Sequence, residues 1–139
     1  MDKTVRVGIG VIMLKDDKVL LGKRNEGNFL GGDSWTCPGG KLEFGENIVS
    51  AIKRETEEEA GIKVNEIKLT SVSNDIAYGN HFVTLGFVCK DFEGQPKVME
   101  SNKITEWKWF SISELPKPLF LPSEKLINNY KEGKIYKGD

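Results

Sequence analysis

The chain is poor in the residues that hold disulfide-rich, zinc-binding or membrane proteins together. It has two cysteines and one histidine in 139 residues, which is too few for a disulfide framework or a zinc site. No apolar run approaches the length of a membrane-spanning helix, and the first residues do not resemble a signal peptide. The sequence therefore predicts a cytoplasmic protein with reduced cysteines and no membrane contact.

The chain also lacks a strong charge of either sign. Lysine and arginine number 20 against 21 aspartates and glutamates, which gives a formal net charge of -1. Proteins that bind nucleic acid through its phosphates usually present a basic surface, so this balance argues against nucleic acid as a partner. Repeats and flexible linkers are absent too, and residues 1–139 are expected to form one domain.

Hydrophobic periodicity predicts an α/β fold in which a mixed sheet packs against helices. Strands are expected at 5–13, 19–24, 63–73, 81–90 and 104–110. Helices are expected at 47–61, 111–116 and 122–133. The second of these helices rests on a Ser-Ile-Ser-Glu capping box that a proline soon follows. A loop containing residues 74, 75, 79 and 80 is expected between two of the strands.

The helix expected between Asn47 and Gly61 is the most informative segment. Asn47 is a suitable N-cap, and Gly61 readily adopts the positive φ of a helix C-terminus. The last turn and a half of this helix holds four acids, although the negative end of a helix disfavours them. They are Glu55, Glu57, Glu58 and Glu59. Such a cluster indicates that a cation offsets the charge.

The phase of the helix separates these acids. At about 100° per residue, Glu55 and Glu59 continue the apolar stripe that Ile48 and Ile52 begin, whereas Glu57 points away. Buried carboxylates without a partner are strongly disfavoured, and carboxylates around Mg²⁺ are common. We therefore expect Glu55 and Glu59 to face a metal ion. The alternative, a solvated acidic helix end, is retained for Glu57.

The segment from Gly40 to Ile62 resembles the Nudix box, G-x5-E-x7-R-E-U-x-E-E-x-G-U, in which U is a bulky apolar residue. The matching residues are Gly40, Glu46, Arg54, Glu55, Glu58, Glu59, Gly61 and Ile62. Thr56 stands where an aliphatic residue is usual, and its hydroxyl is expected to perturb the helix packing slightly. The resemblance extends over nearly the whole chain and implies the Nudix fold, a curved mixed β-sheet sandwiched between α-helices (α/β/α).

Nudix enzymes hydrolyse a nucleoside diphosphate linked to another group, so the resemblance implies a Mg²⁺-dependent pyrophosphohydrolase in which Mn²⁺ can substitute. It also implies a homodimer. The implied metal ligands are Glu55, Glu58, Glu59 and the carbonyl of Gly40. The implied catalytic residues are Arg54, Glu55, Glu58 and Glu100. Arg54 would orient Glu55, and the water-activating base would be a box glutamate or Glu100, for which a solvated loop charge is the alternative.

Residues near the box are candidates for binding the substrate. The cations Lys23, Arg24 and Lys41 could hold phosphate oxygens, with a solvated side chain as the alternative for Lys41. Residues that could contact a base are Phe29, Trp35, Thr36, Cys37, Phe120 and Leu121. A position in the core is the alternative for each aromatic residue in this set.

Three segments resemble the nucleotide diphosphatase group of the family, namely 20–24, 39–46 and 54–56. ADP-ribose pyrophosphatases usually carry a proline shortly after the box, and this chain has none between Ile62 and Gln95. The expected reaction is therefore hydrolysis of a (deoxy)nucleoside triphosphate to the monophosphate and pyrophosphate, with ADP-ribose or another nucleotide sugar as the alternative substrate. A non-catalytic nucleotide-binding module and an enzyme that processes nucleic-acid ends are alternatives of other classes.

Overall fold

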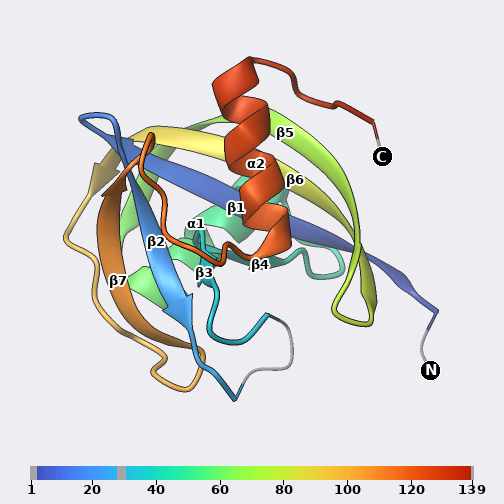
Figure 1. The fold of residues 1–139 in the computed structure, drawn as a ribbon, viewed down its shortest axis with the longest axis horizontal. Coiled ribbons are helices and arrows are strands. Elements are labelled where there is room, and N and C mark those ends of the chain that lie inside the picture. Colours follow the sequence, from blue (N-terminus) through green and yellow to red (C-terminus); the bar gives the residue numbers. More distant parts are fainter. Residues whose placement is uncertain (1–2, 28–30, 139) are drawn as a thin grey trace.

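The computed structural model describes residues 3–27 and 31–138, in which a mixed β-sheet lies between two helices (Figure 1). The strands are β1 (Val5–Lys15), β2 (Lys18–Arg24), β3 (Trp35–Thr36), β4 (Gly39–Lys41), β5 (Lys63–Ala77), β6 (Asn80–Glu93) and β7 (Ile104–Ser111). The helices are α1 (Ile48–Ala60) and α2 (Leu121–Glu132). In Figure 1, α2 crosses in front of the sheet and α1 lies behind it. The expected α/β/α arrangement is confirmed.

Strand β1 joins the two parts of the sheet. It pairs in parallel with β6 over Val5–Met13, and its last residues pair antiparallel with β2. The main strand order is β3-β2-β1-β6-β5, and β7 adds to β2. The short strand β4 pairs with the middle of β1, opposite Gly8, Ile9 and Gly10. This pairing places the start of the Nudix-like box beside the central strand.

Alternation along β1 divides the core into two clusters, because successive side chains point to opposite faces of a strand. Ile9, Val11 and Met13 pack with Ile52 of α1 on one face. Ile12 packs with α2 on the other face. Both clusters consist mainly of side chains that are almost completely buried. The sheet therefore has a buried face under each helix, and it holds the two helices at fixed positions on opposite sides.

Helix α1 has the ends that the sequence predicts. The Asn47 side chain accepts a hydrogen bond from the backbone N–H of Ser50 over 3.2 Å, and Gly61 has a φ of 69° at the C-cap. The expected apolar stripe needs one correction, since Ile48 is 37% exposed. Thr56 is fully buried instead, and its Oγ1 donates to the Ile52 carbonyl oxygen over 2.7 Å. The helix backbone thus satisfies the hydroxyl that replaces the usual aliphatic residue.

The prediction of a short helix at 111–116 is wrong. Ser111 ends β7, and a turn follows in which Glu114 N donates to the Ser111 carbonyl oxygen over 3.0 Å. Pro116 explains the outcome, because a proline disfavours helical geometry in the residue before it. The two residues between the turn and this proline leave no room for a helical turn.

The loop expected around residues 74–80 is also wrong for its first half. Asn74 and Asp75 belong to β5, and the hairpin turn consists of Tyr78 and Gly79, which have φ values of 54° and 75°. Two residues with positive φ suit the twist of a tight antiparallel hairpin. Asp75 is buried beside Lys125, whose Nζ lies 3.1 Å from its Oδ1. This ion pair explains how a polar residue is accommodated in the strand.

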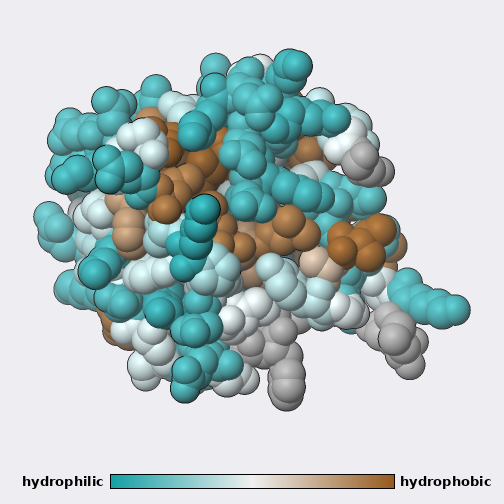
Figure 2. All heavy atoms as spheres, in the orientation of Figure 1, coloured by the Kyte–Doolittle hydropathy of each residue, from teal (hydrophilic) through white to brown (hydrophobic). Residues whose placement is uncertain are grey.

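Two further expectations concern the surface and the cysteines. Figure 2 shows apolar residues exposed on either side of the polar outer surface of α2. No helix among the described residues is both long and apolar enough to cross a membrane. Cys37 and Cys89 are buried and unpaired, and they lie in different core clusters.

Candidate active site

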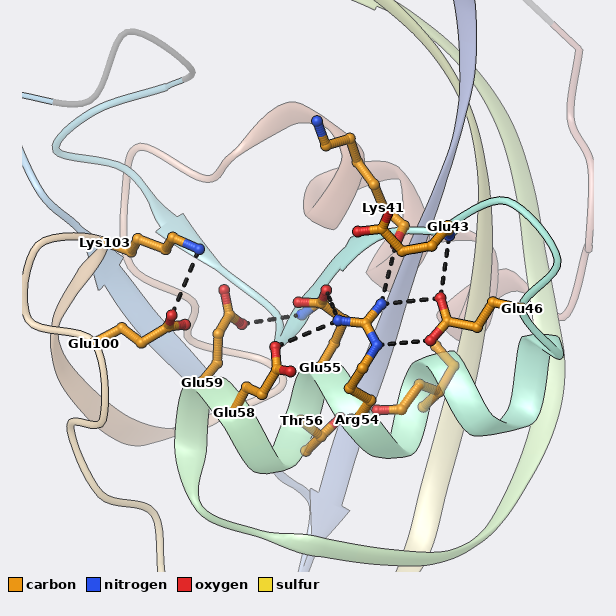
Figure 3. A network of polar contacts seen from close by, with 12 residues as sticks. Lys41, Glu43, Glu46, Arg54, Glu55, Thr56, Glu58, Glu59, Glu100 and Lys103 are labelled. Carbon is orange, nitrogen blue, oxygen red and sulfur yellow. Dashed lines mark hydrogen bonds and ion pairs between the residues drawn. The ribbon is translucent and has the colours of Figure 1, made fainter.

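The acids of α1 meet the backbone of β4 at the edge of the sheet. Figure 3 shows Glu55, Glu58 and Glu59 projecting from one side of α1. Gly39 N donates to Glu59 Oε1 over 3.2 Å. A Cβ atom added at Gly40 would lie 2.4 Å from the Glu55 carboxyl carbon, so only glycine allows this close approach of helix and strand. Glu57 is exposed, which confirms the predicted helical phase for this residue.

The guanidinium of Arg54 donates hydrogen bonds to three acids of the box, Glu46, Glu55 and Glu58 (Figure 3). Its Nε and Nη2 donate to the two oxygens of Glu46 over 2.6 and 2.9 Å. Its Nη1 donates to Glu55 over 2.7 Å and to Glu58 over 3.3 Å. The hydrogen bonds that Arg54 donates to Glu46 are the chief cause of the raised pKa of Arg54 and of the lowered pKa of Glu46. The planar fork therefore fixes the direction of the Glu55 carboxylate.

Glu59 is the acid that the protein alone stabilises least. Burial raises the pKa of its carboxyl to about 8, against which the Gly39 N–H and the charge of Arg24 act only in part. Burial also raises the pKa of Glu55, and the neighbouring Arg54 opposes that change. Within the described part of the chain, no lysine, arginine or histidine forms an ion pair with Glu59. This carboxylate therefore has the chemistry that suits it to binding a cation.

The pKa of Glu59 predicts how the stability of the metal-free protein depends on pH. The ordinary value of 4.5 applies to the unfolded chain, and the folded value is about 8. Between these values the folded state binds more protons, so the free energy of unfolding falls as pH rises from about 4.5 to 8 and then levels off. Glu59→Gln removes this titration. In EDTA, Glu59→Gln should therefore have a higher melting temperature than the wild type, and the difference should grow from pH 5 to pH 8. A constant margin would contradict the assignment.

The residues suit a metal that uses substrate and water as further ligands. Among the residues that the structure describes, no three acidic, histidine or cysteine side chains lie close enough to form a complete site. The donors present are the carboxylates of Glu55 and Glu59 and the backbone of Gly40, which touches Glu55. Mg²⁺ often binds through one or two carboxylates, phosphate oxygens and several waters. The donor set fits such an ion.

A cavity of about 640 Å³ extends from these acids to the N-terminal turn of α2. On the acid side it is bordered by Glu55, Glu59 and three cations, Arg24, Lys41 and Lys103. On the other side its lining is mostly uncharged, and it includes Cys37, Thr36, Phe82, Thr84, Phe120, Ser123 and Leu126. A volume of this size suits a small ligand with an anionic end and a planar, less polar end.

Arg24 links the two sides of the cavity. Its guanidinium carbon lies 4.2 Å from the centre of the Phe120 ring, and Phe120 stacks on Tyr78 with ring centres 5.2 Å apart and an interplanar angle of 5°. Burial lowers the pKa of Arg24, and its Nε has no hydrogen-bond partner in the described part of the protein. The three-layer stack holds a cation beside the cavity without neutralising it.

Two predicted substrate residues, Lys23 and Trp35, are not part of the cavity lining. Lys23 pairs with Asp33 over 3.4 Å and lies 5.6 Å from the Trp35 ring centre. Trp35 is a core residue that packs edge-on against Phe110 at 5.0 Å. Phe29 lies outside the described residues. By contrast, the cavity is bordered by Arg24, Lys41, Cys37 and Phe120, as well as by Glu55, Glu59 and Gly40.

Glu100 lies near the acids of α1 without touching them (Figure 3). Its carboxylate is 3.6 Å from Lys103 Nζ, and its charge contributes to the raised pKa of Glu59. Sequence reasoning named Thr36 of the inner cavity but missed Lys103, Tyr78, Thr84 and Ser123. Tyr78 had a usable signal, since an aromatic residue beside glycine in a polar turn has no local reason to be there. The others carry no local pattern.

Comparisons with known proteins agree with this geometry. Residues 4–130 match the NUDIX domain family model. The ADP-ribose pyrophosphatase of Methanocaldococcus jannaschii is 33% identical over 130 residues, which cover 92% of this chain and 74% of that protein. The 8-oxo-dGTP diphosphatase of Proteus vulgaris is 33% identical over 106 residues, with 76% and 80% covered.

Solved structures show the same relation. The crystal structure of a MutT NUDIX hydrolase from Burkholderia pseudomallei has a TM-score of 0.86 and 32% identity to this chain, and covers 91% of this chain and 98% of that one. The family model spans the box, α1, all seven strands and most of α2. The resemblance inferred from residues 40–62 is thereby confirmed. The chain belongs to the NUDIX family, as a MutT-like pyrophosphohydrolase.

Proposed function

We propose that the protein hydrolyses (deoxy)nucleoside triphosphates to monophosphates and pyrophosphate with the help of Mg²⁺, for which Mn²⁺ can substitute. The observation that carries the proposal is the continuity of the cavity. One space is bordered by the acids Glu55 and Glu59, by cations that include Arg24, Lys41 and Lys103, and by the mostly uncharged surface beneath α2. A nucleotide has the same sequence of parts, because a metal-binding polyphosphate is joined through a sugar to a planar base.

The residues divide the work along this cavity. Glu55, Glu59 and the Gly40 backbone would hold the metal, with Glu58 close by, and Arg54 would keep Glu55 in position. When bound, Mg²⁺ would neutralise phosphate charge and polarise the phosphoryl group. Arg24, Lys41 and Lys103 would bind phosphate oxygens. Catalysis in this arrangement is mainly charge neutralisation and positioning.

Two acids are candidates for accepting the proton of the attacking water. Glu58 is about half exposed and is held by Arg54 over 3.3 Å. Glu100 lies across from it and is held by Lys103. Both carboxylates are therefore held close to Glu55 and Glu59, and each keeps one oxygen that can accept a proton. We propose Glu58 and Glu100 as the alternatives for this role.

ADP-ribose remains the second candidate substrate, and a specific observation favours it. The relative from Methanocaldococcus jannaschii is named as an ADP-ribose pyrophosphatase and is aligned over 92% of this chain. The adenosine and diphosphate parts of ADP-ribose would occupy the same cavity as a nucleotide. A relative from Pelagibacter ubique, 30% identical, is named as an RNA pyrophosphohydrolase. The nearly balanced charge of this chain gives less support to an RNA substrate.

The products distinguish these reactions. Attack of water at the α phosphorus breaks its bond to the bridging oxygen, so dCTP, dGTP or dTTP should give the monophosphate and pyrophosphate, with no orthophosphate. Chromatography of reactions with Mg²⁺ and each triphosphate or ADP-ribose would measure this. Faster cleavage of ADP-ribose than of every triphosphate would overturn the triphosphate proposal. If no substrate turned over with Mg²⁺ or Mn²⁺, the non-catalytic binding module would be the better explanation of the cavity.

A further inference from the structure

The inner wall of the cavity carries two hydroxyl groups whose protons are already used. Thr36 Oγ1 donates to the Cys37 carbonyl oxygen over 2.9 Å. Ser123 Oγ lies 3.0 Å from Thr36 Oγ1 and accepts a hydrogen bond from Cys37 N over 2.9 Å. A hydroxyl has a single proton. Because Thr36 gives its proton to the carbonyl, the proton between the two hydroxyls comes from Ser123.

The same count shows what this wall offers to a ligand. Each hydroxyl oxygen can accept two hydrogen bonds. Thr36 uses one of these positions for Ser123, and Ser123 uses one for the Cys37 N–H, so each keeps one free acceptor position and no free proton. Both side chains border the cavity, although the two residues are only 5% and 4% exposed. Such enclosure makes an unmatched polar contact costly, because water cannot easily replace the missing partner.

The floor beside this wall is shaped for a flat group. Gly8 and Gly10 of β1 border the cavity, where any other residue would add a side chain. A Cβ atom at Gly8 would lie 3.1 Å from Thr84 Oγ1, and one at Gly10 would lie 3.5 Å from Leu126 Cδ2. Two glycines on the same face of the strand therefore leave open backbone between β1 and α2. A planar ring lying on this floor would present its edge to the wall.

We propose that Thr36 and Ser123 select nucleobases that present an exocyclic amino group to this wall, such as cytosine, over bases that present a carbonyl oxygen there, such as uracil. The inference rests on the proposed function, in which the cavity holds a nucleotide. An amino group would donate to the free acceptor positions. A carbonyl oxygen would face two oxygens that have no proton to give, and it would lose its hydrogen bonds to water.

Two of the other donors that border the cavity lie at its far end. Arg6 and Asn80 belong to the first residues of β1 and β6. Arg6 is four residues from Gly10, which is about 13 Å along a strand. Gly10 is the residue that pairs with Gly39, two positions after Cys37. These donors can contact other parts of a nucleotide. The Thr84 hydroxyl borders the cavity beside Gly8, so the lack of a free proton applies to Thr36 and Ser123.

Binding of dCMP and dUMP tests the inference, because the two differ only along one edge of the ring. Cytosine has an amino group and an unprotonated N3 there, and uracil has a carbonyl oxygen and an N3–H. Titration calorimetry should give dCMP about tenfold tighter binding, because a carbonyl oxygen left unmatched at the buried wall loses its hydrogen bonds to water. Equal affinities or tighter binding of dUMP would overturn the inference. Failure of both to bind at millimolar concentration would overturn it as well.

Ser123→Ala should reduce the preference. The change removes one acceptor and leaves the Cys37 N–H free to donate to a carbonyl oxygen, so the affinities for dCMP and dUMP should approach each other. The matched control is Ser71→Ala. Ser71 is also a buried serine that accepts a hydrogen bond from α2, through Asn129 Nδ2 over 2.8 Å, but it does not border the cavity. Ser71→Ala should lower the stability of the protein and leave its preference for dCMP over dUMP unchanged. If the role of Ser123 were purely structural, Ser123→Ala would weaken the binding of dCMP and of dUMP equally.

Hydrolysis of dCTP and dUTP separates this inference from the proposed reaction. A preference for dCMP in binding without cleavage of either triphosphate would overturn the reaction and support the selection of the base. Cleavage of both triphosphates with equal kcat/KM, together with equal binding of the monophosphates, would support the reaction and overturn the selection. Faster turnover of dCTP, measured as kcat/KM, supports both.

Discussion

Glu59→Gln is expected to lower kcat by about 100-fold or more while the protein stays folded. The change removes a negative charge that we propose binds the metal, and a bound metal contributes several kcal/mol to the stabilisation of the transition state. Each 1.36 kcal/mol is about tenfold in rate. The glutamine oxygen can still accept the hydrogen bond from Gly39 N, which is 3.2 Å long in the wild type. Steady-state release of pyrophosphate would measure kcat, and a thermal melt would show whether the variant is folded.

A metal titration gives this prediction a second readout. Mg²⁺ should raise the melting temperature of the wild type, because a ligand that binds only the folded state stabilises it. The increase should be smaller in Glu59→Gln. Glu57→Gln is the matched control, since Glu57 lies on the same helix and is exposed. It should keep its activity and its response to Mg²⁺. Full activity in Glu59→Gln would contradict the metal assignment, and equal losses in both variants would contradict the helical phase.

The features of α1 could be predicted from sequence because they depend on neighbouring residues. The N-cap at Asn47, the end at Gly61 and the inward direction of Glu55 and Glu59 all follow from spacing along one helix. Ile48 was expected on the buried stripe and is partly exposed, because the first turn of α1 extends beyond the apolar cluster under the helix. Periodicity defines the direction of a side chain, and the packing partner decides whether it is buried.

The rest of the site depends on residues that are far apart in the sequence. Thr36 and Ser123 are 87 residues apart and form one hydrogen bond. Tyr78 and Phe120 come from a hairpin and from the N-cap of α2, and they meet only because both lie at one end of the sheet. Composition and spacing contain no information about such pairs. They also could not separate Arg24, which borders the cavity, from the adjacent Lys23, which pairs with Asp33.

Two adjacent glycines of β4 illustrate how closely fold and site are joined. A Cβ atom at Gly39 would lie 2.2 Å from the Ile9 carbonyl oxygen, which belongs to the backbone of the central strand. A Cβ atom at Gly40 would instead meet only the end of the Glu55 side chain, at 2.4 Å. The first glycine is therefore required by the fold. The second is required by the position of one carboxylate, so substitutions at Gly40 can test the site without breaking the sheet.

Gly40→Ala is accordingly expected to lower kcat by about 10- to 100-fold with little change in melting temperature. The new methyl group must displace the Glu55 carboxylate, and a misplacement of about 1 Å can cost 100-fold in rate. Kinetics and a thermal melt of the variant would measure the two effects. Gly27→Ala is the control, because among the described residues its added Cβ would meet only Asn25 Oδ1, at an ordinary 3.5 Å. Full activity in Gly40→Ala would contradict the proposed role of Glu55.

Combining Gly40→Ala with Glu55→Asp distinguishes a displaced ligand from a general disturbance of β4. Aspartate is shorter by one methylene group, so it should withdraw from the added methyl. Glu55→Asp alone should lower kcat, because its carboxylate no longer reaches the position that Arg54 fixes over 2.7 Å. If both changes act through this one carboxylate, the double variant will raise the activation free energy by less than the sum of the increases in the two single variants. Additive losses would show that Gly40 acts on catalysis by a route other than Glu55.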